Sequence, residues 1–287
     1  MKSNIDILFE VFKDLRSLLI VFVLALLLTV ISSIYFDEIP ILVKLGLYKE
    51  NSFWAGFLGN LHNSLLDIFI FTVILSFFTK KRDFENEIKT YKEMVEEFRE
   101  LKTDTASQKI SYCIRKFSEY EIENVNLTRC HLKGVKLWPN DDGPIKLIEA
   151  RLNGSNLSFS NMKKIILTQS DLQAVHLQEA NLQSANLEGT ILKNIRCDKT
   201  NFRGANLQKT NLSGAVLENS IFKNTDFRGA DLSNVSFKGS EFQDANFKGV
   251  LNLDISKLVE CKSLKKAKFD RNINEEINSI KPDLLRN

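Results

Sequence analysis

Hydrophobic residues in the second half of the chain recur at every fifth position. From Leu152 to Phe247 these positions hold Leu, Phe, Met or Cys and never a polar residue. A period of five matches neither the 3.6-residue turn of an α-helix nor the two-residue alternation of a strand. The pattern therefore predicts an internal repeat made of five-residue units.

Within each unit, inward and outward positions alternate. A small or β-branched residue stands two positions before the apolar one, as Ala180 and Ala185 do, and the residue between them is often Asn or Asp. Strand-like alternation places the small and the large residue inside and the middle residue outside. The last two residues of the unit then turn a corner. Four corners predict a twenty-residue coil, with coils stacked at ~4.8 Å and their backbone groups paired between coils.

The units Ala180-Asn181-Leu182, Ala185-Asn186-Leu187 and Ala230-Asp231-Leu232 resemble the A(D/N)LXX motif of the pentapeptide-repeat family. The resemblance covers residues 124–250 and implies an all-β, right-handed quadrilateral β-helix. It also implies a binding or structural role, because proteins of this family are generally such modules. Residues 138–144 break the motif with two prolines and a glycine, so a loop is expected there. The repeat keeps its register across this loop, which fits a bulge in place of one or two units.

Sorting the units by every fourth one divides them into four columns. One column becomes aromatic toward its end and predicts stacked rings inside the coil (Met162, Leu182, Phe202, Phe222 and Phe242). Another column differs on its outer side, where the middle residues are Asn156, His176, Arg196, Val216 and Ser236. Either this face uses a different corner type, or His176, Arg196 and Val216 form a partner-binding face beside Gln178, Asp198 and Glu218.

Two apolar runs near the N-terminus predict a transmembrane α-hairpin. The first, about 17–36, has no charge within it, and twenty residues match the ~30 Å hydrocarbon layer. The second, about 61–79, contains Asp67 near its start, an interfacial residue in this interpretation, and ends at Lys80-Lys81-Arg82. The positive-inside rule places both ends in the cytoplasm and the loop around residues 44–50 outside. We therefore expect a multi-pass protein of a prokaryotic inner membrane, with a cytoplasmic repeat domain.

Helices are expected on both sides of the repeat. The stripe of Phe84, Ile88, Tyr91, Val95 and Phe98 follows spacings of four and three. It fits either a short coiled coil or packing on a second helix at about 105–120, which would cap the first coil. After the repeat, Asp254 is an expected N-cap, and Ile273, Ile277 and Ile280 indicate a short helix over the last coil. The expected organisation is a membrane anchor (1–82), a helical linker and N-terminal cap (83–120), the β-helix (121–250) and a C-terminal helical cap (251–287).

Charge and composition exclude several functions. The chain has a net charge of +3 with 26% charged residues, and its repeat is near neutral, which disfavours nucleic-acid binding and an acidic mimic of DNA. Cys113, Cys130, Cys197 and Cys261 stand apart from each other and from the histidines, so buried reduced thiols are expected and no metal site. Asp141-Asp142-Gly143 fits a turn better than a calcium loop. No catalytic motif is present, so neither an enzyme nor a cofactor is expected.

The sequence thus favours a membrane-anchored, non-enzymatic interaction or scaffold protein. Its expected partners are the lipid bilayer and an unknown cytoplasmic protein, and a homo-oligomer through the linker or the transmembrane helices stays open. One alternative is a membrane effector of a stress or phage-defence system. The other is a gyrase-binding DNA mimic, which the near-neutral charge disfavours.

Overall fold

The computed structural model describes residues 4–35, 51–139 and 143–286. Residues 2–87 form one compact unit and residues 88–287 the other. The loop predicted outside the membrane, around residues 44–50, lies outside the described residues, as do Asp141 and Asp142.

The N-terminal unit is helical. It contains α1 (Asn4–Asp14), α2 (Arg16–Tyr35) and the first part of α4 (Asn51–Phe98). The second apolar run and the predicted linker helix belong to this one unbroken helix, which continues through Lys80-Lys81-Arg82.

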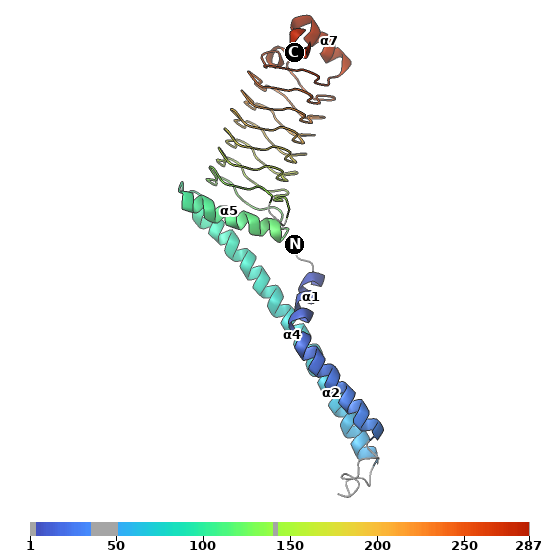
Figure 1. The fold of residues 1–287 in the computed structure, drawn as a ribbon. Coiled ribbons are helices and arrows are strands. Elements are labelled where there is room, and N and C mark those ends of the chain that lie inside the picture. Colours follow the sequence, from blue (N-terminus) through green and yellow to red (C-terminus); the bar gives the residue numbers. More distant parts are fainter. Residues whose placement is uncertain (1–3, 36–50, 140–142, 287) are drawn as a thin grey trace. The chain divides into compact units, whose positions relative to one another are not determined.

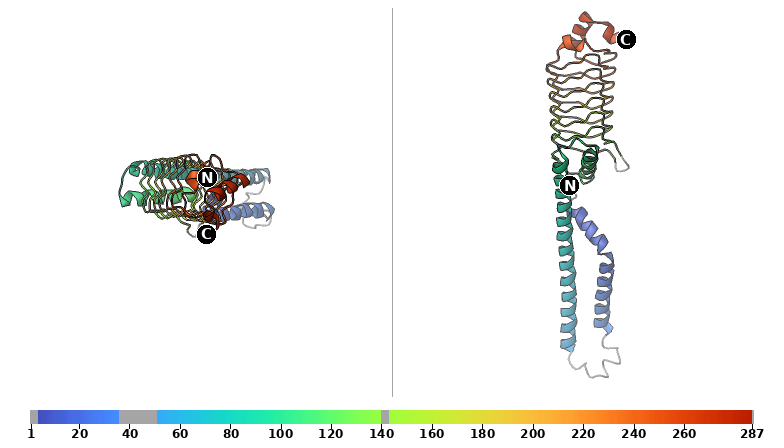
Figure 2. Two further views of the ribbon diagram at one scale, coloured as in Figure 1. Left: turned by 90° about the horizontal axis from the view of Figure 1, so that it is seen from above. Right: turned by 90° about the vertical axis from the view of Figure 1, so that its left-hand side faces the viewer.

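Helices α2 and α4 lie side by side in this unit (Figure 2). The rings of Phe22 and Phe69 stack at 4.3 Å, and Lys80 forms an ion pair with Asp14 at 2.5 Å. Within the described residues, one helical stretch, 63–98, is long and apolar enough to cross a membrane, and Arg16–Ala25 is a shorter apolar helix.

The repeat region is a solenoid of parallel β-bridges (Figure 1). Within the described residues, each unit contributes a single bridge at its outward residue, and no longer strand forms. His176 pairs with Asn156 in the coil before and with Arg196 in the coil after, each twenty residues away. This register confirms the predicted coil of four five-residue units.

The first coil is longer than the others. Asn126 pairs with Arg151, 25 residues later (151 − 126), whereas Lys146 pairs with Ile166, 20 residues later (166 − 146). The five extra residues belong to the loop that begins near Trp138. The loop therefore takes the place of one unit and leaves the register intact, as the sequence predicted.

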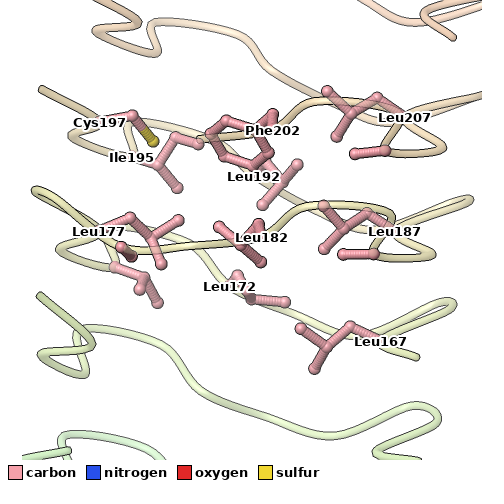
Figure 3. Close-up of a cluster of buried hydrophobic side chains, with 14 of the residues drawn as sticks. Leu167, Leu172, Leu177, Leu182, Leu187, Leu192, Ile195, Cys197, Phe202 and Leu207 are labelled. Carbon is pink, nitrogen blue, oxygen red and sulfur yellow. The ribbon is translucent and has the colours of Figure 1, made fainter. Parts of the chain in front are cut away.

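Side chains at the inward positions fill the interior of the coil (Figure 3). The predicted aromatic column is confirmed, because Phe222 stacks on Phe202 and on Phe242 with ring centroids 5.0 Å apart in each case. In the next column Phe227 stacks on Phe247 at 4.8 Å. Burial of each such side chain contributes roughly 1.5–3 kcal/mol relative to exposure.

The corners need a left-handed residue at the fifth position of the unit. Gly204 takes a φ of 66° there and Ala174 a φ of 56°. Glycine adopts this conformation without steric cost, whereas other residues are strained by about 1–2 kcal/mol. The outward Asn or Asp offsets part of this cost with a hydrogen bond inside the corner: the backbone N–H of Gln183 donates to Asn181 Oδ1 at 3.1 Å.

Helices cover the first coil. The residues of α5 (Asp104–Glu119) that face it are fully buried, among them Ile110, Ile114 and Phe117. The ring of Tyr91 on α4 meets Phe117 edge-on at 6.3 Å. The apolar stripe of α4 therefore packs on α5 of the same chain, which is the second of the two arrangements its spacing allowed.

These helices also donate hydrogen bonds to the open edge of the first coil. In the interior such carbonyls accept an N–H from the coil before, as His176 O does from Leu157 N at 2.8 Å. Side chains take over this role at the edge: Arg99 donates to Asn126 O and Thr128 O, Ser107 Oγ to His131 O, and Arg115 to Lys136 O. The edge is thus closed against pairing with another chain.

The solenoid continues past the predicted end near Val250. After the short helix α6 (Ile255–Leu258), Ser263 still pairs with Glu241 and Lys268 with Asn246. The spacing here is 22 residues (263 − 241), so α6 adds two residues and hides these last units from a strict five-residue pattern.

Short helices close the C-terminal end. The predicted N-cap of α6 is confirmed, because Asp254 accepts from the N–H of Ser256 at 3.0 Å. The predicted helix with Ile273, Ile277 and Ile280 is α7 (Arg271–Ile280), which buries Ile277. It is followed by α8 (Asp283–Arg286), where Leu284 O accepts from the N–H of Leu264.

Candidate functional site

The candidate site is the column of outward residues that departs from the repeat motif, here called the divergent column (Asn156, His176, Arg196, Val216 and Ser236). β-Bridges join each member to the next, so the column is continuous. His176, Arg196 and Val216 are exposed, and even the isopropyl group of Val216 leaves that residue 38% accessible. The structure therefore brings the three predicted residues together on one surface.

These three side chains do not make the corner hydrogen bond of the repeat. Asn156, the member that keeps the motif, accepts from the N–H of Ser158 at 3.0 Å. Arg196 and Val216 have no side-chain acceptor and cannot do so. The corner must be held in another way.

Buried hydroxyl groups hold it instead. Thr200, Ser220 and Ser240 stand directly behind the corner, one above the other. The N–H of Thr200 donates to Ser220 Oγ at 3.0 Å, and the N–H of Ser220 donates to Ser240 Oγ at 2.8 Å. Ser220 Oγ also donates to the carbonyl of Cys197 at 2.8 Å. The different corner type that the sequence left open is therefore present.

Sequence analysis did not single out this hydroxyl ladder. Its signal was available, because hydroxyl residues recur at the small inward position at intervals of exactly one coil: Thr200, Ser220 and Ser240. Since the hydroxyls sit inside, they stabilise the corner without using the outward side chains. The outward positions are thus relieved of a structural duty that Asn or Asp performs in the other columns.

Polar side chains beside the column are held in place by the neighbouring coil. The hydrogen bonds are those from Ser158 Oγ to Gln178 Oε1 (2.7 Å), from Asn219 Nδ2 to Asp198 Oδ1 (2.8 Å) and from Ser236 Oγ to Glu218 Oε1 (2.8 Å). The divergent column therefore has a cationic, aromatic and apolar line with an ordered, partly acidic border. Such a border lowers the conformational entropy that a partner would have to remove on binding.

The chemistry of this surface is that of recognition. Cys197 is the inward residue of the column, and burial raises the pKa of its thiol far above the ordinary value, which keeps it protonated. Among the described residues, no group of three or more His, Cys, Asp or Glu side chains is arranged to hold a metal ion. The column instead offers hydrogen-bond donors, one positive charge and an exposed apolar group.

The coil geometry defines the class: a parallel β-solenoid with five-residue units and four units per coil. The family model "Pentapeptide repeats" matches residues 150–189, 180–219 and 210–249, with 8 copies. This part of the chain is a pentapeptide-repeat domain, a group of generally non-enzymatic structural or interaction proteins, and the right-handed β-helix is the form that such repeats imply.

Solved pentapeptide-repeat structures resemble the chain over the same region. HetL, a protein involved in heterocyst differentiation regulation from the cyanobacterium Nostoc sp., is 26% identical with a TM-score of 0.32; the match covers 45% of this chain and 61% of HetL, less than two thirds of its length. QnrB1, a plasmid-mediated fluoroquinolone resistance protein, is 15% identical with a TM-score of 0.29, covering 55% of this chain and 83% of QnrB1. The search of curated proteins found no match.

Proposed function

We propose that this protein is a membrane-anchored, non-enzymatic interaction protein whose pentapeptide-repeat domain binds a cytoplasmic protein through His176, Arg196 and Val216. The observation that carries the binding assignment is that these side chains are exposed while buried hydroxyls stabilise their corners. Positions that folding does not require can vary toward binding. Arginine and aromatic groups are also the residues most enriched at binding hot spots.

The membrane anchor is supported by the surface of the N-terminal unit. Apolar side chains point outward all along α2 and the apolar part of α4, for example Ile20, Val21, Leu24, Ile68, Phe71 and Phe78. A contiguous apolar surface of this length is unstable in water and marks a membrane or protein interface. The length of the apolar runs matches a bilayer, and the cations that follow them favour a cytoplasmic position for both ends.

The binding surface is tested with the full chain extracted from membranes in mild detergent. The double variant His176→Asn and Arg196→Asn restores the motif, and we expect the proteins that co-purify with the natural chain to fall about tenfold, a loss of about 1.4 kcal/mol. The matched control, Arg151→Asn with Ile191→Asn, makes the same kind of change in the neighbouring leucine column and should retain them.

Thermal unfolding of both variants decides between the explanations of this column. Asn can form the corner hydrogen bond, so both variants should melt within about 0.5 kcal/mol of the natural protein or slightly above it. Equal recovery of partners by the folded double variant and the control would exclude the divergent column as the binding site. Unfolding of the double variant alone would show that His176 and Arg196 serve the corner.

A further inference from the structure

Helix α1 carries an apolar stripe that the protein itself leaves uncovered. Ile7 and Val11 are buried, while Ile5, Leu8, Phe9 and Phe12 are exposed, Phe9 at 72%. The exposed residues are spaced i, i+3, i+4 and i+7, so they share one side of the helix. A helix of eleven residues with two contacting residues and a second apolar stripe facing outward needs a partner for that stripe.

Part of this stripe borders a groove shared with α4. Ile5 and Leu8 line it from α1, and Val73, Ile74, Phe77 and Phe78 line it from α4, around a volume of about 310 Å³. All six lining residues are apolar. A groove without a hydrogen-bonding group fits hydrocarbon and disfavours a polar ligand or a peptide backbone, whose N–H and C=O groups would stay unsatisfied.

Cations follow the groove directly along α4. Lys81 is four residues after Phe77, and Arg82 is four residues after Phe78, so both lie one turn further on the same side of the helix. Lys80 is engaged by Asp14 at 2.5 Å. Arg82 lies 3.9 Å from Asp83, and both are exposed, so this pair is weak and readily exchanged.

An apolar groove that ends at two cations matches one ligand chemistry in particular. An anionic phospholipid has an acyl chain for the groove and a phosphate for the positive end. The groove is also continuous with the exposed apolar surface of α4, at Ile74 and Phe78. A second copy of this chain would cover the stripe as well, but it would bring its own Lys81 and Arg82 close to the first pair.

We propose that α1 and residues 73–82 of α4 form a binding site for an anionic phospholipid, with an acyl chain in the groove and the phosphate at Lys81 and Arg82. Phe9 and Phe12 then lie at the membrane interface, where an amphipathic helix places its apolar side. This inference rests on the proposed membrane attachment and adds a specific lipid contact to it.

The test compares two lipids on the full chain in nanodiscs. Phosphatidylglycerol with a photoreactive acyl chain should crosslink to α1 and to residues 73–78, and unlabelled phosphatidylglycerol should compete at least about tenfold better than phosphatidylcholine, since each cation near an anionic surface contributes about 1 kcal/mol. Lys81→Gln with Arg82→Gln should abolish this preference. The control, Lys89→Gln with Lys92→Gln on the same helix, should keep it.

Three outcomes would overturn the inference. They are an unchanged lipid preference in the Lys81→Gln and Arg82→Gln variant, crosslinks elsewhere on the chain, and crosslinks from α1 to a second copy of the protein. Membrane attachment is measured separately by carbonate extraction. A chain that resists extraction without a lipid preference leaves the anchor in place and removes only the lipid site, whereas a chain that is extracted contradicts the anchor itself.

Discussion

At the scale of single residues, one position of the repeat does two jobs. The outward Asn or Asp faces solvent and also closes its own corner, as Asn211 does by accepting from the N–H of Ser213 at 3.0 Å. In the divergent column these jobs are separated, because the hydroxyls of Thr200 and Ser220 act from inside. Separation is what allows a cation or an apolar group outside without loss of the coil.

The inward aromatic residues should dominate the stability of the later coils. Phe222 is fully buried between two stacked rings, so Phe222→Ala should lower the free energy of unfolding by about 3–5 kcal/mol. The exposed Val216→Ala should change it by less than about 0.5 kcal/mol. Denaturant unfolding of the full chain in detergent checks both, and equal effects would show that the aromatic column is not close-packed.

At the scale of elements, the ends of the solenoid are where it is vulnerable. Each interior coil has its backbone groups satisfied by two neighbours, whereas the first coil has one. Three donors from the linker replace the missing neighbour, and Arg99 serves two carbonyls alone with a side chain that is only 12% exposed. The linker is thus a structural part of the repeat domain.

Loss of this donor should loosen the first coil selectively. Arg99→Ala leaves the carbonyls of Asn126 and Thr128 without their charged donor, at a cost of about 1–3 kcal/mol for each unsatisfied group. Hydrogen–deuterium exchange should accelerate in residues 125–137 and stay unchanged beyond residue 200. Arg271→Ala, which removes a side chain that is 93% exposed, serves as the control. Uniform protection in Arg99→Ala would refute this role for the linker.

At the scale of the whole molecule, the cysteines make the topology measurable. All four are buried, and burial raises the pKa of the Cys113 thiol to about 11 and those of Cys130 and Cys261 to about 12. The folded protein therefore presents almost no thiolate at neutral pH. Above pH 9 the unfolded chain loses these protons first, so the stabilisation present below pH 9 is lost as the pH rises through about 11–12.

An introduced cysteine should consequently be labelled without background. In intact cells at pH 7, a membrane-impermeant maleimide should react with Lys44→Cys, and with Arg271→Cys only after permeabilisation, because the loop is expected outside and the repeat domain inside. The natural protein should stay unlabelled in both conditions. Labelling of Lys44→Cys only after permeabilisation would reverse the proposed orientation.

Much of this fold was predictable from sequence because its rules are local and periodic. A side chain in a five-residue unit faces inward or outward by its place in the unit, and its column follows from counting by twenty. The aromatic column, the bulge of one unit and the alignment of His176 with Arg196 and Val216 all follow from this arithmetic. Each is a property of neighbours along the chain repeated at a fixed interval.

Only the tertiary structure decided what happens where the period stops. Arg99 meets carbonyls 27 and 29 residues away, α6 shifts the register by two residues before the last bridges, and α4 runs unbroken through its basic residues. The groove between Leu8 and Phe77 is of the same kind. These features depend on the approach of segments with unrelated sequences, and no local pattern encodes such a distance.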